Sequence, residues 1–226
     1  MILLDVVVPA YRCAPYLREA IDSALAQEDA DVRVTVVDDA SDDDVAGVVA
    51  ELDDARVRYV RRDVQGGISA ARNDGLRLAD RPWLAFLDGD DVWPADRTRA
   101  LHEAAAPLPG AIAVGLVQAF GTTTRLRIDP EPARAYVAGG ILLRRDDAAT
   151  VGDFDEALRS GEFIDWMSRA RTAGLIDVHV DAIVLHRRVH EASTTATRRD
   201  LRADYLDAVR AHLARRPSTG GAEGSA

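Results

Sequence analysis

Residues 83 to 91 read Trp-Leu-Ala-Phe-Leu-Asp-Gly-Asp-Asp, an apolar run that ends in three carboxylates. The run is too short to span a membrane and too uniformly apolar for an exposed strand, so we expect a buried strand of a parallel sheet. Ligands of open α/β sheets bind beyond the carboxyl ends of the strands. Because close carboxylates repel one another, Asp88, Asp90 and Asp91 suit Mg²⁺ or Mn²⁺ bound together with substrate phosphates. Alternatively, Asp90 or Asp91 caps the helix expected near Pro94.

Strand-length apolar segments alternate with helical patterns in the first hundred residues. The expected strands are 2–8, 32–37, 57–60 and 83–87, and the helices that follow them are 15–27, 45–52, 70–78 and 95–106. This alternation predicts an α/β fold with a doubly wound, mostly parallel central sheet.

The Pro-Leu-Pro-Gly sequence at 107–110 predicts a boundary between residues 1–108 and a second half at 109–214. In the second half we expect strands at 111–120, 122–128, 137–144 and 178–184, a turn at 152–156, and helices at 162–174 and 201–213. Residues 215–226 contain mostly small and polar residues, which predicts a disordered tail.

Composition argues against several classes of protein. The formal net charge of −10 argues against a nucleic-acid partner or an anionic membrane surface. All 28 basic residues are arginine, which excludes a P-loop lysine and Schiff-base chemistry on lysine. Cys13 is the only cysteine, so an internal disulfide and a cysteine-based zinc site are excluded. No transmembrane segment or signal peptide is evident, and we expect a cytoplasmic protein.

Four motifs stand in order along the first half. They are Val-Val-Pro-Ala-Tyr at 7–11, Val-Val-Asp-Asp-Ala-Ser at 36–41, Gly-Gly-Ile-Ser-Ala-Ala-Arg-Asn at 66–73 and Phe-Leu-Asp-Gly-Asp-Asp at 86–91. Together they resemble the inverting family-2 glycosyltransferases of the GT-A fold, closely over the first hundred residues and loosely beyond. The resemblance implies a Rossmann-like nucleotide-binding sheet, with residues 1–108 as the donor-binding half and 109–214 as a compact acceptor-binding and catalytic half.

The resemblance also implies an activity, which is metal-dependent transfer of a sugar from a nucleotide-sugar donor. The expected donor is a UDP-sugar and the expected cofactor is Mn²⁺ or Mg²⁺. The acceptor is open: a small molecule, a peptide or a lipid-linked glycan. The residues that the family would use for the donor are Pro9, Ala10, Tyr11, Asp39, Arg72, Asn73, Asp88 and Arg188, with Asp90 and His190 for the metal.

Individual roles follow from the resemblance. Asp39 would accept a hydrogen bond from the uracil imide, since a carboxylate pairs with an N–H donor. Asp88 would reach the ribose, and Asp90 would hold the metal that bridges the two phosphates. The alternatives are turn chemistry for Asp39, a solvated helical face for Arg72 and Asn73, and a structural or solvated role for His190.

The general base has two candidates. Inverting transfer needs a carboxylate to deprotonate the acceptor, and the family usually supplies it from a Glu-Asp pair at a helix start. Here Phe163 stands at the usual aspartate position, so Glu162 and Asp165 remain, three residues apart on one helical face. We slightly favour Asp165 over Glu162. Alternatively, Glu162 caps the helix and Asp165 pairs with Arg169.

Three rival functions are kept. A nucleotide-sugar binding protein without transferase activity, suggested by Phe163, would bind UDP with metal and show no turnover. A sugar nucleotidyltransferase typically has basic residues in a glycine-rich loop after the first strand, whereas this chain has only Arg12 there. A phosphatase with an Asp-x-Asp nucleophile would carry that motif after an early strand, not the fourth.

Overall fold

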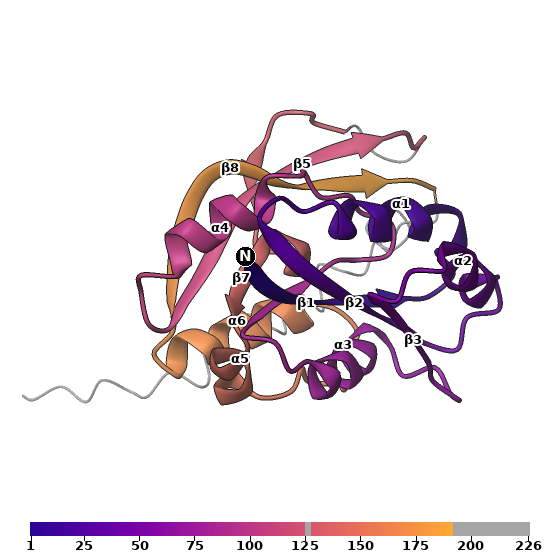
Figure 1. Cartoon of the computed structure of the whole chain (residues 1–226), viewed down its shortest axis with the longest axis horizontal. Coiled ribbons are helices and arrows are strands. Elements are labelled where there is room, and N and C mark those ends of the chain that lie inside the picture. Colours follow the sequence, from indigo (N-terminus) through magenta and orange to yellow (C-terminus); the bar gives the residue numbers. More distant parts are fainter. Residues whose placement is uncertain (125–127, 192–226) are drawn as a thin grey trace, which may run out of the picture.

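The computed structural model describes residues 1–124 and 128–191, and Figure 1 shows their arrangement. The strands within these ranges are β1 (Ile2–Ala10), β2 (Ala30–Asp38), β3 (Val57–Arg61), β4 (Trp83–Phe86), β5 (Ala111–Gly121), β6 (Ala133–Arg134), β7 (Ile141–Arg144) and β8 (Ile176–Val189). The helices are α1 (Ala14–Leu25), α2 (Val45–Leu52), α3 (Ile68–Leu78), α4 (Arg97–Ala105), α5 (Arg145–Val151) and α6 (Glu162–Thr172), and a 3-10 turn, η1, covers Ala138–Gly140.

The strands form one mixed sheet in the order β3-β2-β1-β4-β7-β5-β6, with β8 beside β5. The first four strands are parallel, and β7 runs antiparallel to both β4 and β5. The chain builds β1, β2 and β3 in one direction and then places β4 on the other side of β1. This reversal is the topological switch point at which open α/β sheets bind ligands.

Helices cover both faces of the sheet, with α1 and α4 on one side and α3, α5 and α6 on the other (Figure 1). Successive residues of a strand point to opposite faces, and β1 is apolar on both faces apart from the buried Asp5. Val6 belongs to the core that includes Leu17 of α1, while Val7 belongs to the core that includes Trp166 of α6. The α/β fold with a parallel central region is therefore confirmed.

The strands and helices predicted for the first half are all present, with ends that differ by a few residues. The helix after the fourth strand begins later than expected, at Arg97, and Asp96 holds its N-cap position. Neither Asp90 nor Asp91 caps this helix, so that alternative is wrong. Asp44 does cap α2, because its side chain accepts a hydrogen bond from the backbone N–H of Gly47 at 3.0 Å.

Several predictions for the second half need correction. The described residues of the expected strand 122–128 form no strand, and the segment expected as a strand at 137–144 begins with η1, so only Ile141–Arg144 is extended. Helix α5 was not predicted. The expected helix at 201–213 and tail at 215–226 lie outside the described residues. In the part that the structure describes, no helix is both long and apolar enough to cross a membrane.

Candidate functional site

The loops that follow β1, β2 and β4 meet at one edge of the sheet. Ala10 pairs with Asp38 at the ends of β1 and β2, and Val7 pairs with Phe86 where β4 ends. Pro9 and Ala10 are buried at this edge, whereas Tyr11 is 38% exposed. The motif residues of the first, second and fourth strands are thus brought together, as the parallel topology requires.

The Asp88–Asp91 loop is held from β8. The backbone N–H of Arg188 donates to Asp91 Oδ1 at 2.8 Å, and its Nε donates to the backbone carbonyl of Asp90 at 2.8 Å. The guanidinium also pairs with Glu19 of α1 at 2.5 Å. His190 Nε2 lies 3.1 Å from Asp90 Oδ2. The end of β8 therefore reaches the loop after β4, across nearly a hundred residues of sequence.

The charged forms of Asp90 and Asp91 are destabilised by burial and by the neighbouring carboxylates. Burial raises the pKa of Asp90, with a further contribution from the charge of Asp88, while His190 acts in the opposite direction. Burial also raises the pKa of Asp91 well above its usual range, followed by the charges of Asp90 and Asp88. A divalent cation would stabilise the charged form of these groups.

Two of these side chains have the chemistry of metal ligands. Asp90 and His190, which lie in contact with each other, are the residues that would hold a divalent metal through a carboxylate oxygen and an imidazole nitrogen. Among the described residues, no group of three or more His, Cys, Asp or Glu side chains forms a metal site. Two protein ligands with the remainder from phosphates and water is the usual arrangement for Mg²⁺ at nucleotides.

Arg72 of α3 links the two halves of the chain at this edge. Its Nη2 donates to Asp88 Oδ1 at 2.9 Å, and its Nη1 donates to Glu162 Oε1, from the first turn of α6, at 2.7 Å. The side chain is almost fully buried. Burial disfavours the charged guanidinium, but the charges of Asp88 and Glu162 outweigh that effect and raise the pKa of Arg72.

The two candidate bases lie in different surroundings. Asp165 is 1% exposed and its Oδ2 accepts a hydrogen bond from Arg169 Nε at 2.9 Å. Glu162 is directed at Arg72 instead, and no side chain caps the N-terminus of α6. Phe163 is buried and stacks on Trp166, with ring centroids 6.3 Å apart. The residue at the usual aspartate position therefore belongs to the hydrophobic core.

Asn73 is 1% exposed and fixes the loop that precedes α6. Its Oδ1 accepts from the backbone N–H of Phe154 at 2.7 Å, and its Nδ2 donates to the carbonyl of Phe154 at 3.0 Å and to Glu156 at 2.9 Å. The oxygen and the nitrogen of the Asn73 side-chain amide are therefore both hydrogen-bonded within the protein. Asn73 is thus placed to position the loop before α6, behind the site.

Asp39 is held by the glycine turn that opens α3. Its Oδ1 accepts from the N–H of Gly66 at 2.8 Å and its Oδ2 from the N–H of Gly67 at 2.7 Å. Gly67 has a φ of 87°, a conformation that favours glycine. The second and third motifs of the sequence are thus joined directly by hydrogen bonds.

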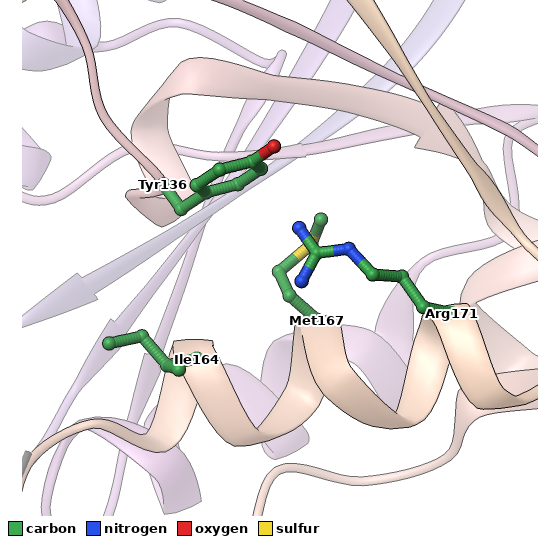
Figure 2. Close-up of a pocket in the computed structure, with 4 residues that line it drawn as sticks. All are labelled: Tyr136, Ile164, Met167 and Arg171. Carbon is green, nitrogen blue, oxygen red and sulfur yellow. The ribbon is translucent and has the colours of Figure 1, made fainter. Parts of the chain in front are cut away.

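A separate cavity of about 240 Å³ lies beside α6 (Figure 2). Ile164, Met167 and Arg171 line it from one helical face, and Tyr136 lies across from them. The Tyr136 hydroxyl donates to Asp177 at 2.9 Å, and Arg171 Nη2 pairs with the same carboxylate at 2.6 Å. The cavity contains none of the carboxylates predicted for chemistry.

Sequence reasoning missed Glu19, Tyr16 and Arg62 at this edge. Tyr16 and Glu19 look like ordinary residues of an amphipathic helix, yet Tyr16 packs against the His190 ring at 4.6 Å and Glu19 pairs with Arg188. No local pattern identifies them. Arg62 follows the third strand closely, and its place near a strand end is a signal that could have been used.

The family model described as "Glycosyl transferase family 2" matches residues 5–156, which include all of the first-half motifs and extend to the turn before α6. The chain belongs to glycosyl transferase family 2. Among curated relatives, the succinoglycan biosynthesis protein ExoO of Rhizobium meliloti is 34% identical over 90% of this chain and 64% of its own length. The Escherichia coli protein WfaP, named as a UDP-Glc:α-D-GlcNAc-diphosphoundecaprenol β-1,3-glucosyltransferase, is 31% identical over 41% of this chain and 37% of its own.

Solved structures with low sequence identity share the fold. The Staphylococcus aureus TarS fragment 1–349 in complex with UDP-GlcNAc has a TM-score of 0.74 and 18% identity, covering 95% of this chain and 66% of that fragment. The fragment in complex with UDP has a TM-score of 0.71 with 19% identity, covering 94% of this chain and 65% of that fragment. The GT-A fold is therefore confirmed. The chain spans less than two thirds of the length of ExoO and WfaP.

Proposed function

We propose that this chain is a metal-dependent inverting glycosyltransferase that uses a UDP-sugar donor. The observation that carries the proposal is the convergence of Asp88, Asp90 and Glu162 at one edge of the sheet, with Arg72 and His190 between and beside them. WfaP is named for UDP-Glc, and the TarS fragment is known in complexes with UDP and UDP-GlcNAc, which supports a UDP-sugar as the donor.

In this proposal residues 1–108 hold the donor. Pro9, Ala10 and Tyr11 flank the nucleotide, Asp39 accepts the uracil imide N–H, and Asp88 hydrogen-bonds the ribose. Asp90 and His190 hold Mn²⁺ or Mg²⁺, which offsets the negative charge of the diphosphate when bound. Arg188 orients Asp90 and Asp91, and adds positive charge near the diphosphate.

We propose Glu162, ahead of Asp165, as the general base. Glu162 is partly exposed and shares its ion-pair partner Arg72 with Asp88. Asp165, in contrast, is buried and paired with Arg169. The acceptor oxygen attacks the anomeric carbon, its proton passes to the Glu162 carboxylate, and the bond to UDP breaks with its electron pair on the diphosphate. Arg72 holds Glu162 near this position through its ion pair.

The acceptor is a hydroxyl group of a small molecule, a peptide or a lipid-linked glycan, held by residues 109–214. The name of WfaP, which specifies a diphosphoundecaprenol-linked acceptor, favours the lipid-linked glycan.

The proposal is tested first through the metal site. Asp90→Asn should weaken UDP binding in the presence of Mn²⁺ at least tenfold, because it removes a charged ligand, and should leave metal-free binding nearly unchanged. Isothermal titration calorimetry measures both. Asp22→Asn, in an exposed pair with Arg18 on α1, is the control. Equal affinity of the Asp90→Asn variant and the wild type with Mn²⁺ would contradict the metal assignment.

A donor-binding protein without turnover is the second candidate, favoured by Phe163 at the usual aspartate position. Both candidates bind UDP with metal. Release of UDP from a panel of UDP-sugars, with water or added glycans as acceptor, separates them. Tight donor binding with no UDP release would favour the second candidate.

A further inference from the structure

Arg62 follows β3 and contacts the end of β2 and helix α3, beside the proposed binding site of the uracil base. Its backbone N–H donates to the carbonyl of Asp38 at 2.9 Å, next to the end of β2. Its Nε lies 3.5 Å from Asp39 Oδ1, and its Nη1 lies 3.5 Å from Asp74 Oδ2 on α3. The side chain is 21% exposed. Arg62 therefore ties the end of β2 to α3 across the glycine turn.

Gly66 makes room for this guanidinium. A Cβ at position 66 would lie 2.7 Å from Arg62 Nη2 and 2.9 Å from Ala70 Cβ, closer than side chains approach. Gly66 does not have a positive φ, so space and not backbone conformation requires glycine here. The guanidinium thus packs on the backbone whose N–H groups bind Asp39.

Three positive or donor groups converge on the Asp39 carboxylate. They are the N–H groups of Gly66 and Gly67 and the guanidinium of Arg62. Asp39 is 3% exposed, and a buried carboxylate is tolerated when such donors surround it. An ionised carboxylate can only accept hydrogen bonds, so it selects a base whose edge presents an N–H.

The hydrogen bonding of Arg62 is incomplete. Its Nη1 is buried and has only the ion-pair contact with Asp74, without a hydrogen bond. Buried donors are normally satisfied, and an exception needs an explanation. The contacts with Asp39 and the glycine turn fix where the Arg62 guanidinium lies. This placement toward the Asp39 carboxylate explains why Nη1 is left without a hydrogen bond.

We propose that Arg62 is a positioning residue for the choice of nucleobase, which holds the Asp39 carboxylate in the orientation that lets the site prefer uracil to cytosine. Uracil presents an N3–H to the carboxylate, whereas N3 of neutral cytosine is an acceptor and is repelled by it. The inference rests on the proposed use of a UDP-sugar and adds the residue that sets the choice of base.

The experiment measures the affinities of UDP and CDP with Mn²⁺ by calorimetry. In Arg62→Met the preference for UDP over CDP should fall at least tenfold, mainly through weaker UDP binding. Arg62→Lys, which keeps the charge, should retain part of the preference. Arg58→Met, at an exposed position of β3, is the matched control and should keep the wild-type ratio.

Gly66→Ala provides an independent route to the same result. The added methyl group displaces the guanidinium, so this variant should lose preference for UDP as Arg62→Met does. The double variant should lose little more than either single one, because residues in contact are not additive. Thermal unfolding of each variant identifies misfolding. Should Arg62→Met fail to fold, Arg62→Lys and Gly66→Ala decide the matter.

The outcomes distinguish a wrong donor from a wrong role for Arg62. A wild type that binds neither diphosphate, or shows no preference for UDP, contradicts the proposed donor and this inference together. A wild type that prefers UDP, with the same preference in the Arg62→Met variant, overturns the inference alone. Equal losses of UDP and CDP affinity indicate a merely structural Arg62 and also overturn it.

Discussion

Arg72 contributes one guanidinium to two carboxylates that come from different halves of the chain. Asp88 follows β4 and Glu162 opens α6, and both lie within 2.9 Å of the Arg72 nitrogen atoms. A buried arginine with paired acids is costly to disrupt from one side only, since the remaining charge is left unpaired. In the proposed function, the donor side and the acceptor side of the site are therefore linked through a single side chain.

Glu162→Gln should lower turnover of the UDP-sugar about 10²- to 10⁴-fold, the usual contribution of a general base. UDP affinity should change less than turnover, because Arg72 keeps its ion pair with Asp88 in this variant. Rates of UDP release and calorimetry on the same preparation give both quantities. A variant with wild-type turnover would exclude Glu162 as the base.

Asp165→Asn serves as the matched comparison on the same helix. It breaks a largely buried pair with Arg169 and should lower the free energy of unfolding by about 2 kcal/mol, with turnover of the folded fraction retained. Denaturant unfolding measures the first effect. Loss of turnover in Asp165→Asn at unchanged stability would restore Asp165 as the preferred base.

Asp38 predicts a pH-dependent contribution to stability. Burial alone would raise its pKa, but hydrogen bonds from Ser41 and Tyr59 and the charge of Arg61 outweigh burial, and the pKa of Asp38 is lowered. A lowered pKa in the folded state stabilises the protein above about pH 4, and this stability is lost as pH falls through the folded-state pKa.

Asp38→Asn should therefore cost about 2 kcal/mol at pH 7, from the loss of charged hydrogen bonds, and progressively less below pH 4. Urea unfolding of wild type and variant between pH 3 and 7 measures the difference. A cost that stays constant over this range would show that the charge of Asp38 does not contribute. Asp181→Asn, exposed on β8, controls for general charge effects.

At the scale of the elements, α3 carries two of the candidate site residues, Arg72 and Asn73, and packs closely on β1. Gly75 allows this contact, because a Cβ there would lie 2.2 Å from Val7 Cγ1. Arg72 and Asn73 belong to the same helix, so its distance from the sheet sets where both side chains reach. The close contact at Gly75 therefore affects where Arg72 meets Asp88 and Glu162.

Gly75→Ala should destabilise the protein by about 1 to 3 kcal/mol through overpacking, despite the higher helix propensity of alanine. Thermal or urea unfolding measures this. Val7→Ala combined with Gly75→Ala should recover part of the loss, since it removes the methyl groups in the way. A Gly75→Ala variant as stable as wild type would show that α3 can move outward without cost.

The alternating strands and helices of the first half could be predicted because each segment has its own periodicity and end signals. The second half could not be predicted as well. Strand β7 has only four residues, and the sequence Ala-Gly-Gly before it resembles part of a longer strand while it forms η1. Arg188 pairs with Glu19, and Arg72 pairs with Glu162. Both pairs join residues that are far apart in the sequence, so no local sequence pattern predicts them.

At the scale of the whole molecule, the sheet does not separate into the two halves suggested by sequence. Strand β7 lies between β4 and β5 and pairs with both, so residues from beyond 108 complete the hydrogen bonds of a strand from before it. The proposed donor and acceptor halves share one sheet and contribute to both of its buried faces.

A fragment of residues 1–108 should therefore fail to behave as an independent domain. It leaves the β4 edge unpaired and exposes Leu84 and Phe86, which the second half covers. Size-exclusion chromatography and circular dichroism should show aggregation or incomplete folding, with residues 1–191 as the comparison. A monomeric, cooperatively folded fragment would contradict this expectation.

The antiparallel insertion of β7 has an evolutionary consequence. A chimera joined at residue 108 would take β4 from one parent and its pairing partner β7 from the other, so the contact between these two strands would not be inherited together. Recombination that keeps β4, β7 and β5 from one parent, and varies only the loops around them, should give folded chimeras more often than a junction at the proline-rich turn.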